Sequence, residues 1–574
     1  MNLLNRLYNW LLYPIRTNRE FYVYLLALSV ILTVVSNIHQ SNDIFLATLI
    51  PIWGAYLYCL LAAALRPLYL RWIAWLVASL MWLGEIFSVL FYQSLYSVRL
   101  VKLILETDTR EASEFLSGLW ATPALWITLA CGVAAALLAY ALVRAWASTP
   151  KLARRILIAL MLILTLWSAL RGEHSYIKLI RCFRLDSVAQ LNDERYLPCL
   201  RTPTIRFVYG IAYTTLSVRE YETLVPAVEQ TRVDDCSFRS PCIVLIIGES
   251  FNKHHTPLYN PASLPTTPNL CRLRDDGSLA VFTDVVTPSN LTAQVFKELL
   301  STPNTLFPAA FRKAGYDVFF WSNQFVVNGT GGLFSNLGGA LVNHPDLARL
   351  QFTARNTSTF SYDSDLNADL RAFIADSLHG AINRPSLFIV HYIGQHVSYA
   401  DRFPPEYNRF SGDSLQPTFG GKQGCRIRAE YANATLFHDH CLDELWQLFA
   451  DRDAIAVYLS DHGEEVYDWR NFYERSDQNS LNPQIAHYQF EIPFFVLTSD
   501  SFRLNHPDIM AEVAQAVHKP FINSDVCHLL FHLAGIRMPD YRPDRDILSP
   551  SYDTTCHRFI GDHTDYDELI RDLN

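Results

Sequence analysis

The sequence predicts an α/β protein with an N-terminal bundle of five transmembrane helices, followed by an exported domain with helices on both faces of a mostly parallel sheet. Three observations lead to this fold class. Half of the 574 residues are hydrophobic and only 18% are charged, a composition that suggests a membrane protein. Nearly uncharged runs recur within residues 1–170. From residue 241 onward, strand-like and helix-like segments alternate, which predicts a layered α/β domain.

The predicted membrane part, residues 1–170, contains runs that approach the roughly 20 residues needed to cross a bilayer. The predicted spans are residues 21–38, 44–65, 72–92, 121–143 and 156–170. The third span includes Glu85, and because a carboxylate is costly in hydrocarbon we expect it to face the bundle or a wet cavity.

Charge between the spans predicts their orientation. The segments before span one, between spans two and three, and between spans four and five are mainly basic, whereas residues 106–114 between spans three and four are mostly acidic. The positive-inside rule therefore predicts a cytoplasmic N-terminus, with everything after residue 170 on the opposite side. The formal net charge of -9 argues against a nucleic-acid partner.

The remainder divides into a connector, residues 171–240, with no clear periodicity, and a catalytic domain, residues 241–574. In that domain the pattern predicts buried strands alternating with helices. The expected strands are 243–247, 317–321, 386–390 and 454–459, and the expected helices are 307–314, 365–377 and 428–449.

Eleven cysteines are scattered without any Cys-x-x-Cys pair, which disfavours an all-cysteine zinc site. Nine of them follow residue 170, on the predicted exported side. Because an oxidising compartment permits disulfides, we expect several of these cysteines to be paired, although the sequence does not give the pairing.

Candidate metal ligands follow two of the predicted strands. Glu249 stands directly after the run 243–247, and Asp461 and His462 follow the run 454–459. Ligands of α/β proteins bind beyond the carboxyl ends of such strands. Carboxylates with an imidazole suit Zn²⁺, or less well Mn²⁺, and three ligands leave a position open for a substrate. The alternatives are that Glu249 caps a helix and that Asp461 only begins a turn.

Two further histidines are candidates by position. His396 follows closely on the strand 386–390, and His487 precedes the buried run 492–496. A single histidine is more often structural, but several candidate ligands beside predicted strand ends favour one site.

A nucleophile is also needed, and Thr292 precedes the helical stretch 295–300. A threonine there normally caps the helix. The same position would let the helix N-terminus stabilise a phosphate esterified on its hydroxyl. Ser250 is the rival nucleophile, although a role as a helix cap explains it more simply.

These residues carry a family resemblance that spans nearly the whole chain. The sequence resembles the bacterial phosphoethanolamine transferases of the alkaline phosphatase and sulfatase superfamily, most closely the type that modifies the lipopolysaccharide core. The matching stretches are Gly248-Glu249-Ser250, Thr292 before a helix, His391 to His396, and the specific segment 460–468. The Tyr259-Asn260-Pro261 and Tyr431-Ala432-Asn433 stretches depart from the family pattern.

The resemblance implies a sulfatase-like periplasmic domain tethered to the inner membrane. It implies that zinc is held by Glu249, Thr292, Asp461 and His462, and that Thr292 is the covalent nucleophile. His396 and His487 would contact the phosphoryl group or a second zinc ion. The implied donor is phosphatidylethanolamine, and the implied acceptor is the core or lipid A of lipopolysaccharide, both held in a lipid bilayer.

Three other functions compete with this one. A glycerophosphate transferase of the same superfamily, or a phosphatase- or sulfatase-type hydrolase, would use a similar site. A catalytically inactive envelope scaffold has no need of a complete ligand set, so the presence of all four candidate ligands argues against it.

Overall fold

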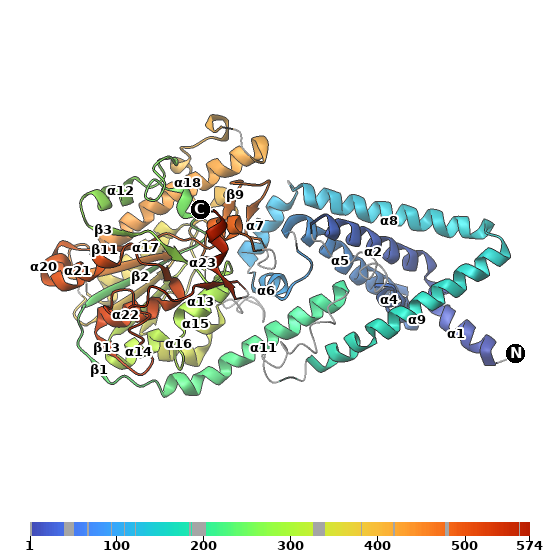
Figure 1. Ribbon diagram of the computed structural model, residues 1–574, viewed down its shortest axis with the longest axis horizontal. Coiled ribbons are helices and arrows are strands. Elements are labelled where there is room, and N and C mark those ends of the chain that lie inside the picture. The colour runs from blue at the N-terminus through green and yellow to red at the C-terminus, as the bar shows by residue number, and fades with distance from the viewer. Residues whose placement is uncertain are drawn as a thin grey trace. The chain divides into compact units, whose positions relative to one another are not determined.

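The computed structural model describes residues 3–39, 51–65, 68–92, 94–107, 109–120, 122–182, 185, 202–324, 339–379, 382–416, 419–476, 481–561 and 563–573. The chain forms two compact units, residues 1–220 and residues 221–574. Figure 1 labels the helices and strands of both.

All regular elements in the described part of the first unit are helices. Its helices are α1 (Leu3–Thr17), α2 (Arg19–His39), α4 (Pro51–Ala64), α5 (Leu68–Tyr92), α6 (Val98–Glu106), α7 (Thr109–Leu119), α8 (Pro123–Ser148) and α9 (Lys151–Cys182), with α11 (Pro203–Glu229) continuing into the second unit. Within the described residues, three segments are long and apolar enough to cross a membrane: Arg19–Ser36, Tyr69–Tyr92 and Pro123–Ser148.

The predicted count of five spans is not confirmed. Predicted span two, 44–65, lies partly outside the described residues, and its described part forms a shorter apolar helix, Ile52–Ala64. Predicted span five, 156–170, lies inside α9, a helix that continues to Cys182 and is not among the three.

Glu85 is buried inside the first unit, as expected from its cost in hydrocarbon. Its side chain has no exposed surface and forms an ion pair with Arg206 of α11. The Nε of Arg206 donates to Oε1 across 2.6 Å, and the backbone N–H of Tyr96 donates to the same oxygen across 3.0 Å. The ion pair and the hydrogen bonds together offset the desolvation cost of burying this carboxylate.

The sequence predicted no helix or strand in the connector. Much of residues 171–240 is helical, because α9 extends through Cys182 and α11 covers Pro203–Glu229. Neither stretch has a strong apolar stripe, which is why periodicity failed to reveal them.

The second unit is built on a sheet of seven strands in the order β3-β11-β8-β2-β7-β5-β6. Five neighbours, β8 to β6, run parallel, and β11 runs antiparallel to both β8 and β3. The strands are β2 (Cys242–Gly248), β3 (Leu279–Phe282), β5 (Asp317–Ser322), β6 (Ala354–Arg355), β7 (Ser386–His391), β8 (Ala454–Ser460) and β11 (Phe494–Thr498). The predicted α/β class is therefore confirmed as a mixed, mainly parallel sheet.

Helices cover both faces of this sheet, as alternate residues of β2 demonstrate. Ile243, Leu245 and Ile247 belong to one core, together with residues of α13 (Thr292–Leu300), α14 (Phe307–Ala314), α21 (Pro507–Ala516) and α22 (Val526–Ala534). Val244 and Ile246 belong to a second core with residues of α12 (Pro268–Asp275), α17 (Asp363–Ser377) and α18 (Gly421–Gln447). Since side chains alternate along a strand, β2 is buried on both sides, which explains its unbroken apolar run.

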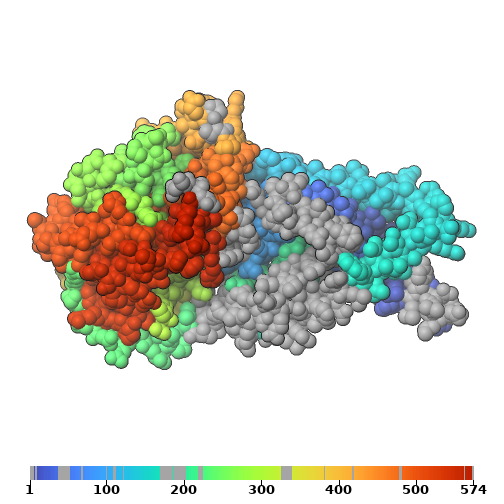
Figure 2. Space-filling model, in the orientation of Figure 1, coloured from blue at the N-terminus to red at the C-terminus, as the bar shows by residue number. Residues whose placement is uncertain are grey.

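The remaining elements of the second unit are short. They include β1 (Asp235–Cys236), β4 (Val285–Val286), β9 (Glu465–Val466), β10 (Tyr473–Glu474), β12 (Phe521–Ile522), β13 (Ile536–Arg537), β14 (Phe559–Ile560), β15 (Thr564–Asp565), α15 (Ala340–Asn343), α16 (Pro345–Gln351), α19 (Pro483–Gln489), α20 (Asp500–Asn505) and α23 (Tyr566–Leu569). Figure 2 shows that segments following β11, in red, form much of the surface of this unit on the side that faces the viewer.

The expected disulfides are not found among the cysteines that the structure describes. Seven of them in the second unit carry free thiols: Cys236, Cys242, Cys271, Cys425, Cys441, Cys527 and Cys556. Several are simply part of the packed interior, for example Cys242 in β2 and Cys527 in α22. A buried thiol behaves there as a small apolar side chain. The side chains of Cys182 and Cys199 lie outside the described residues.

Candidate active site

The pairing of β2 with β8 brings Glu249 and Asp461 together. Gly248 and Ser460 are register partners in this parallel pair, so the residue that follows each strand emerges at the same edge of the sheet. The N–H of Asp461 donates to the carbonyl of Gly248 across 2.9 Å and continues the pairing by one residue. The two carboxylates predicted from separate strand ends therefore share one site.

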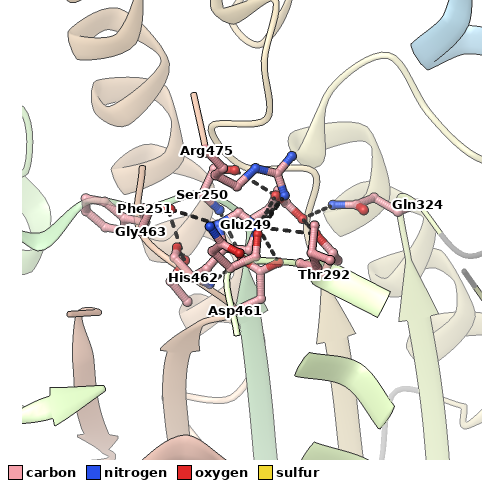
Figure 3. Close-up of polar contacts among 12 residues, drawn as sticks. Glu249, Ser250, Phe251, Thr292, Gln324, Asp461, His462, Gly463 and Arg475 are labelled. Carbon is pink, nitrogen blue, oxygen red and sulfur yellow. Dashed lines mark hydrogen bonds and ion pairs between the residues drawn. The ribbon is translucent and has the colours of Figure 1, made fainter. Parts of the chain in front are cut away.

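Thr292 and His462 complete the group with these two carboxylates. The hydroxyl of Thr292 donates to Oε2 of Glu249 across 3.0 Å and lies 3.3 Å from Nε2 of His462. Figure 3 shows the four side chains converging above the strand ends. Glu249, Asp461 and His462 have no exposed surface, whereas Thr292 is partly exposed. The hydroxyl is thus the member of the set that a molecule from solution can reach.

Thr292 does not cap its helix, contrary to the simpler prediction. It is the first residue of α13, and Leu291 occupies the cap position without a side-chain hydrogen bond. Its hydroxyl points to Glu249 instead. The helix N-terminus still carries partial positive charge, which favours an anion bound to that oxygen.

The prediction that Ser250 caps a helix is wrong. The next element is the single-turn 3₁₀ helix Lys253–His255, which Asn252 caps. Ser250 has no exposed surface and a positive φ of 58°, and its hydroxyl donates to Oε1 of Glu249 across 2.7 Å. Its role in the structure is to orient that carboxylate.

The hydrogen bonds of His462 fix its tautomer. Nδ1 lies 2.9 Å from the carbonyl oxygen of Gly463, which only accepts, so Nδ1 carries the proton. Nε2 lies 2.8 Å from Nη1 of Arg475, which only donates, so Nε2 presents its lone pair. Burial, followed by the charge of Arg475, lowers the pKa of His462 and agrees with a neutral ring.

That lone pair also faces two carboxylate oxygens. Because these electron-rich atoms repel one another, the arrangement favours binding of a cation between them. Nε2 of His462 is 3.2 Å from Oε1 of Glu249 and 3.2 Å from Oδ2 of Asp461. Within the described part of the chain, Oδ2 is buried without a hydrogen-bond donor. Burial and then the charge of Glu249 raise the pKa of Asp461 well above its ordinary value, a cost that a bound cation would remove.

The spacing is compatible with a zinc ion. Ligand atoms about 2.0–2.1 Å from a tetrahedral zinc lie roughly 3.3 Å from one another. The measured separations among the Thr292 hydroxyl, His462 Nε2 and the two carboxylates are 3.0, 3.2, 3.2 and 3.3 Å. Imidazole, carboxylate and hydroxyl are also ligand types that zinc accepts.

His396 lies on a loop that wraps around the backbone of Glu249. Asp363 accepts hydrogen bonds from the N–H groups of Ile393 and Gly394, each across 3.0 Å, and the N–H of Gln395 donates to the carbonyl of Glu249 across 3.0 Å. The partly exposed ring of His396 interacts electrostatically with Glu249. Burial lowers the pKa of His396 to about 3.

His487 lies in a different group. Its Nδ1 is 2.9 Å from Oε1 of Glu491, and its ring stacks on that of His254 at 3.8 Å between centroids. Glu491 also accepts from Nζ of Lys253 at 2.6 Å and from the hydroxyl of Tyr566 at 2.9 Å.

Although His254, His487 and Glu491 are potential metal ligands, this second group differs from the first. Nε2 of His254 lies 3.2 Å from the carbonyl of His487 and 3.3 Å from Oε2 of Glu491, both acceptors, so it presents a proton and not a lone pair. The Lys253 ammonium already neutralises the carboxylate. The geometry of this group is therefore that of a structural hydrogen-bond network and not that of a metal site.

Sequence reasoning missed Arg475 and Gln324. Arg475 follows a hairpin of β9 and β10 that returns the chain to His462, and strands of two residues leave no pattern to detect. Gln324 follows β5 and donates to Oε2 of Glu249 across 3.1 Å. The rule that identified Glu249, a polar residue just past a buried strand, would also have found Gln324.

The fold and the site define an α/β protein whose strand ends present a zinc-type ligand set beside a partly exposed threonine. The chain belongs to the sulfatase family, because the profile of that family matches residues 241–536, more than half of the chain.

Curated relatives extend the similarity to the first unit. The phosphoethanolamine transferase EptC of Escherichia coli K12 is 26% identical over 534 residues, 89% of this chain and 88% of that protein. The phosphoethanolamine transferase CptA of Salmonella typhimurium LT2 is 26% identical over 532 residues, with the same coverage. The resemblance to phosphoethanolamine transferases is thereby confirmed.

Solved structures agree on the fold. The integral membrane lipooligosaccharide phosphoethanolamine transferase A of Neisseria meningitidis matches 94% of this chain and 98% of its own, with a TM-score of 0.58 and 17% identity. The C-terminal periplasmic domain of EptC from Escherichia coli matches 60% of this chain and 97% of its own, with a TM-score of 0.50 and 25% identity.

Proposed function

We propose that the protein transfers phosphoethanolamine from phosphatidylethanolamine to a lipopolysaccharide acceptor through a covalent intermediate on Thr292. The observation that carries this proposal is the Thr292 hydroxyl, partly exposed at a helix N-terminus and 3.0 Å from Glu249. The two relatives named phosphoethanolamine transferase, each matching 89% of the chain, support the choice of the transferred group.

The proposed zinc ligands are Glu249, Thr292, Asp461 and His462. Zinc bound there would lower the pKa of the threonine hydroxyl and neutralise charge on the phosphoryl oxygens. Mn²⁺ suits the imidazole less well.

In the first half-reaction, the oxygen of Thr292 attacks phosphorus and the bond to diacylglycerol breaks. Glu249 accepts the hydrogen bond of that hydroxyl in the structure, so it is placed to receive its proton. Burial lowers the pKa of His396, on the adjacent loop, to about 3, so the neutral ring is proposed to contact the phosphoryl group. The proton taken from Thr292 passes to the diacylglycerol oxygen as that oxygen leaves.

In the second half-reaction, a hydroxyl or phosphate oxygen of the acceptor attacks the same phosphorus. The bond to Thr292 breaks, and the threonine oxygen recovers the proton that the acceptor hydroxyl gives up. His487 has no part in this scheme, since its described contacts are with the group around Glu491.

The first unit serves to hold the protein where both lipids are found. We propose an inner-membrane location with a cytoplasmic N-terminus and the second unit in the periplasm, as the charge between the spans predicts. A bilayer then supplies the donor directly. The carboxylates of residues 106–114 remain a candidate surface for its ammonium group.

Intact mass spectrometry of the zinc-loaded full chain tests this function. After incubation with phosphatidylethanolamine, the parent and Ser250→Ala should each gain one phosphoethanolamine group, and Thr292→Ala should gain none. An adduct that persists in Thr292→Ala would place the nucleophile elsewhere. Steady release of free phosphoethanolamine without an acceptor would instead indicate a hydrolase, the second function that a sulfatase-type domain supports.

A further inference from the structure

Arg475 is a cation beside the candidate metal ligands whose charge no described carboxylate pairs directly. Its Nη1 donates to Nε2 of His462 across 2.8 Å and to the carbonyl of Asn290 across 3.3 Å. Both contacts use the Nη1 end of the guanidinium. Among the described residues, none accepts a hydrogen bond from its Nε or Nη2.

The position of Arg475 is tied to that of the nucleophile. Asn290, two residues before Thr292, donates from its side chain to the carbonyl of Ser476 across 2.9 Å and to Oε1 of Gln489 across 2.7 Å. The N–H of Ser476 donates to the same Gln489 oxygen across 3.1 Å. The loop that carries Thr292 and the segment that carries Arg475 therefore form one hydrogen-bonded body.

Exposure also sets Arg475 apart from the buried ligands. It is partly exposed, like Thr292, whereas Glu249, Asp461 and His462 are fully buried. Figure 3 shows its side chain reaching over the cluster to the group formed by Glu249 and Thr292. The open side of the site thus combines a hydroxyl with a guanidinium.

We infer that Arg475 holds the oxygens of the phosphoryl group that is transferred. The Nε–Nη2 edge of a guanidinium donates two parallel hydrogen bonds, and these match two oxygens of a phosphate. A charge that is already oriented toward the attack site stabilises the negative charge that grows there. This inference rests on the proposed function and names the residue that recognises its substrate class, a phosphate ester.

Metal binding would strengthen this role. If the lone pair of His462 Nε2 bound a metal, Nε2 would no longer accept a hydrogen bond from Arg475. Nη1 would then donate only to the carbonyl of Asn290. The guanidinium then has one more donor for an anion.

Calorimetric titration of inorganic phosphate into the zinc-loaded full chain tests the inference. We expect Arg475→Met to weaken phosphate binding by about ten- to a hundredfold, the range for loss of a charge-assisted hydrogen bond. The phosphate affinity of Arg475→Lys should lie between those of the parent and Arg475→Met, because an ammonium keeps the charge but lacks the two parallel donors of a guanidinium. Arg384→Met, at an exposed arginine 3.4 Å from Asp317, is the matched control and should bind like the parent.

Zinc content is measured on every variant, because an arginine that only positioned His462 would alter metal binding. Phosphate binding by Arg475→Met within twofold of the parent would overturn the inference, as would loss of zinc in parallel with loss of phosphate.

The rate at which the Thr292 adduct forms separates this inference from the proposed function. Adduct formation in Arg475→Met at the parent rate would remove Arg475 from the reaction and leave the transfer intact. The parent protein could instead bind phosphate through Arg475 and never form the adduct. That result would support the anion site and contradict the proposed transfer.

Discussion

Thr292 and Glu249 are 43 residues apart in the chain, yet the hydroxyl of one donates to the carboxylate of the other across 3.0 Å. The contact joins the first turn of α13 to the end of β2. The threonine oxygen consequently has an acceptor for its proton before any substrate arrives.

The first prediction follows from that contact. Thr292→Val keeps the shape of the side chain but removes the hydroxyl, so adduct formation should fall by at least about a thousandfold. Thr292→Ser keeps the oxygen and should still form the adduct. Both are measured by the rate of mass gain with phosphatidylethanolamine, and an equal loss in the two variants would contradict a nucleophilic role.

Zinc binding gives the second prediction. Asp461→Asn exchanges an oxygen of a proposed zinc ligand for an amide at the end of β8, and zinc affinity should fall by at least about a hundredfold. Asp453, at the other end of the same strand and paired with His506 at 3.0 Å, provides the control, Asp453→Asn. Competition with a chromophoric chelator measures both, and equal affinities would remove Asp461 from the metal site.

Gly394 and Gly277 form a matched pair for the third prediction. Both have positive φ, +45° and +81°, so alanine strains the backbone at each. A Cβ on Gly394 would lie only 2.8 Å from the carbonyl oxygen of Glu249, whereas a Cβ on Gly277 meets nothing within 4 Å. Gly394→Ala should therefore reduce zinc content, and Gly277→Ala should cost only about 1 kcal/mol of stability. An unchanged zinc content in Gly394→Ala would show that the loop carrying Gly394 can shift to accommodate the Cβ without displacing Glu249.

The fourth prediction concerns acid sensitivity. Burial lowers the pKa of His438 to about 3, and its Nε2 is 2.8 Å from the hydroxyl of Tyr458. An unfolded histidine titrates near 6.5, so between about pH 6.5 and pH 3 the unfolded chain binds the extra proton and stability falls as pH falls. This residue should contribute a slope of up to about 1.4 kcal/mol per pH unit.

His438→Gln removes that slope while keeping a polar partner for Tyr458. The variant should be less stable than the parent at pH 7, and the difference in thermal midpoint should narrow as the pH is lowered toward 4. A difference that stays constant over this range would assign the acid sensitivity to other groups.

The fifth prediction tests the buried ion pair of the first unit. Glu85→Gln removes the negative charge that faces the Arg206 guanidinium and should cost about 3–5 kcal/mol. The double variant Glu85→Gln with Arg206→Gln should recover part of that loss. Thermal unfolding in detergent compares the three proteins, and additive losses would mean that the pair contributes no coupling.

The core of the sheet and the buried candidate ligands were predictable from the sequence for one physical reason. β2 and β8 are buried on both faces, so each is an unbroken apolar run that ends where a carboxylate begins. The pattern thus located Glu249 and Asp461 together with the strands that carry them. That both acids meet at one site follows from the register of Gly248 with Ser460, which no local pattern records.

The features that the sequence did not reveal are formed by very short elements or by contacts between residues that no local pattern connects. Arg475 reaches His462 through a hairpin whose strands have two residues each, too short for any periodicity. His487 matched the pattern of a ligand but is engaged by Glu491, which the order of residues alone cannot distinguish. Helix α11 was overlooked because it lacks the apolar stripe by which a helix is detected.

The partial exposure of Thr292 beside three fully buried candidate ligands has a stereochemical consequence for the proposed transfer. Because Thr292 is the partly exposed member of the set, both halves of the proposed transfer take place at its oxygen, and diacylglycerol departs before the acceptor attacks the same phosphorus. Each displacement inverts the phosphorus centre. Two inversions in succession return a chiral phosphorus to the handedness with which it arrived.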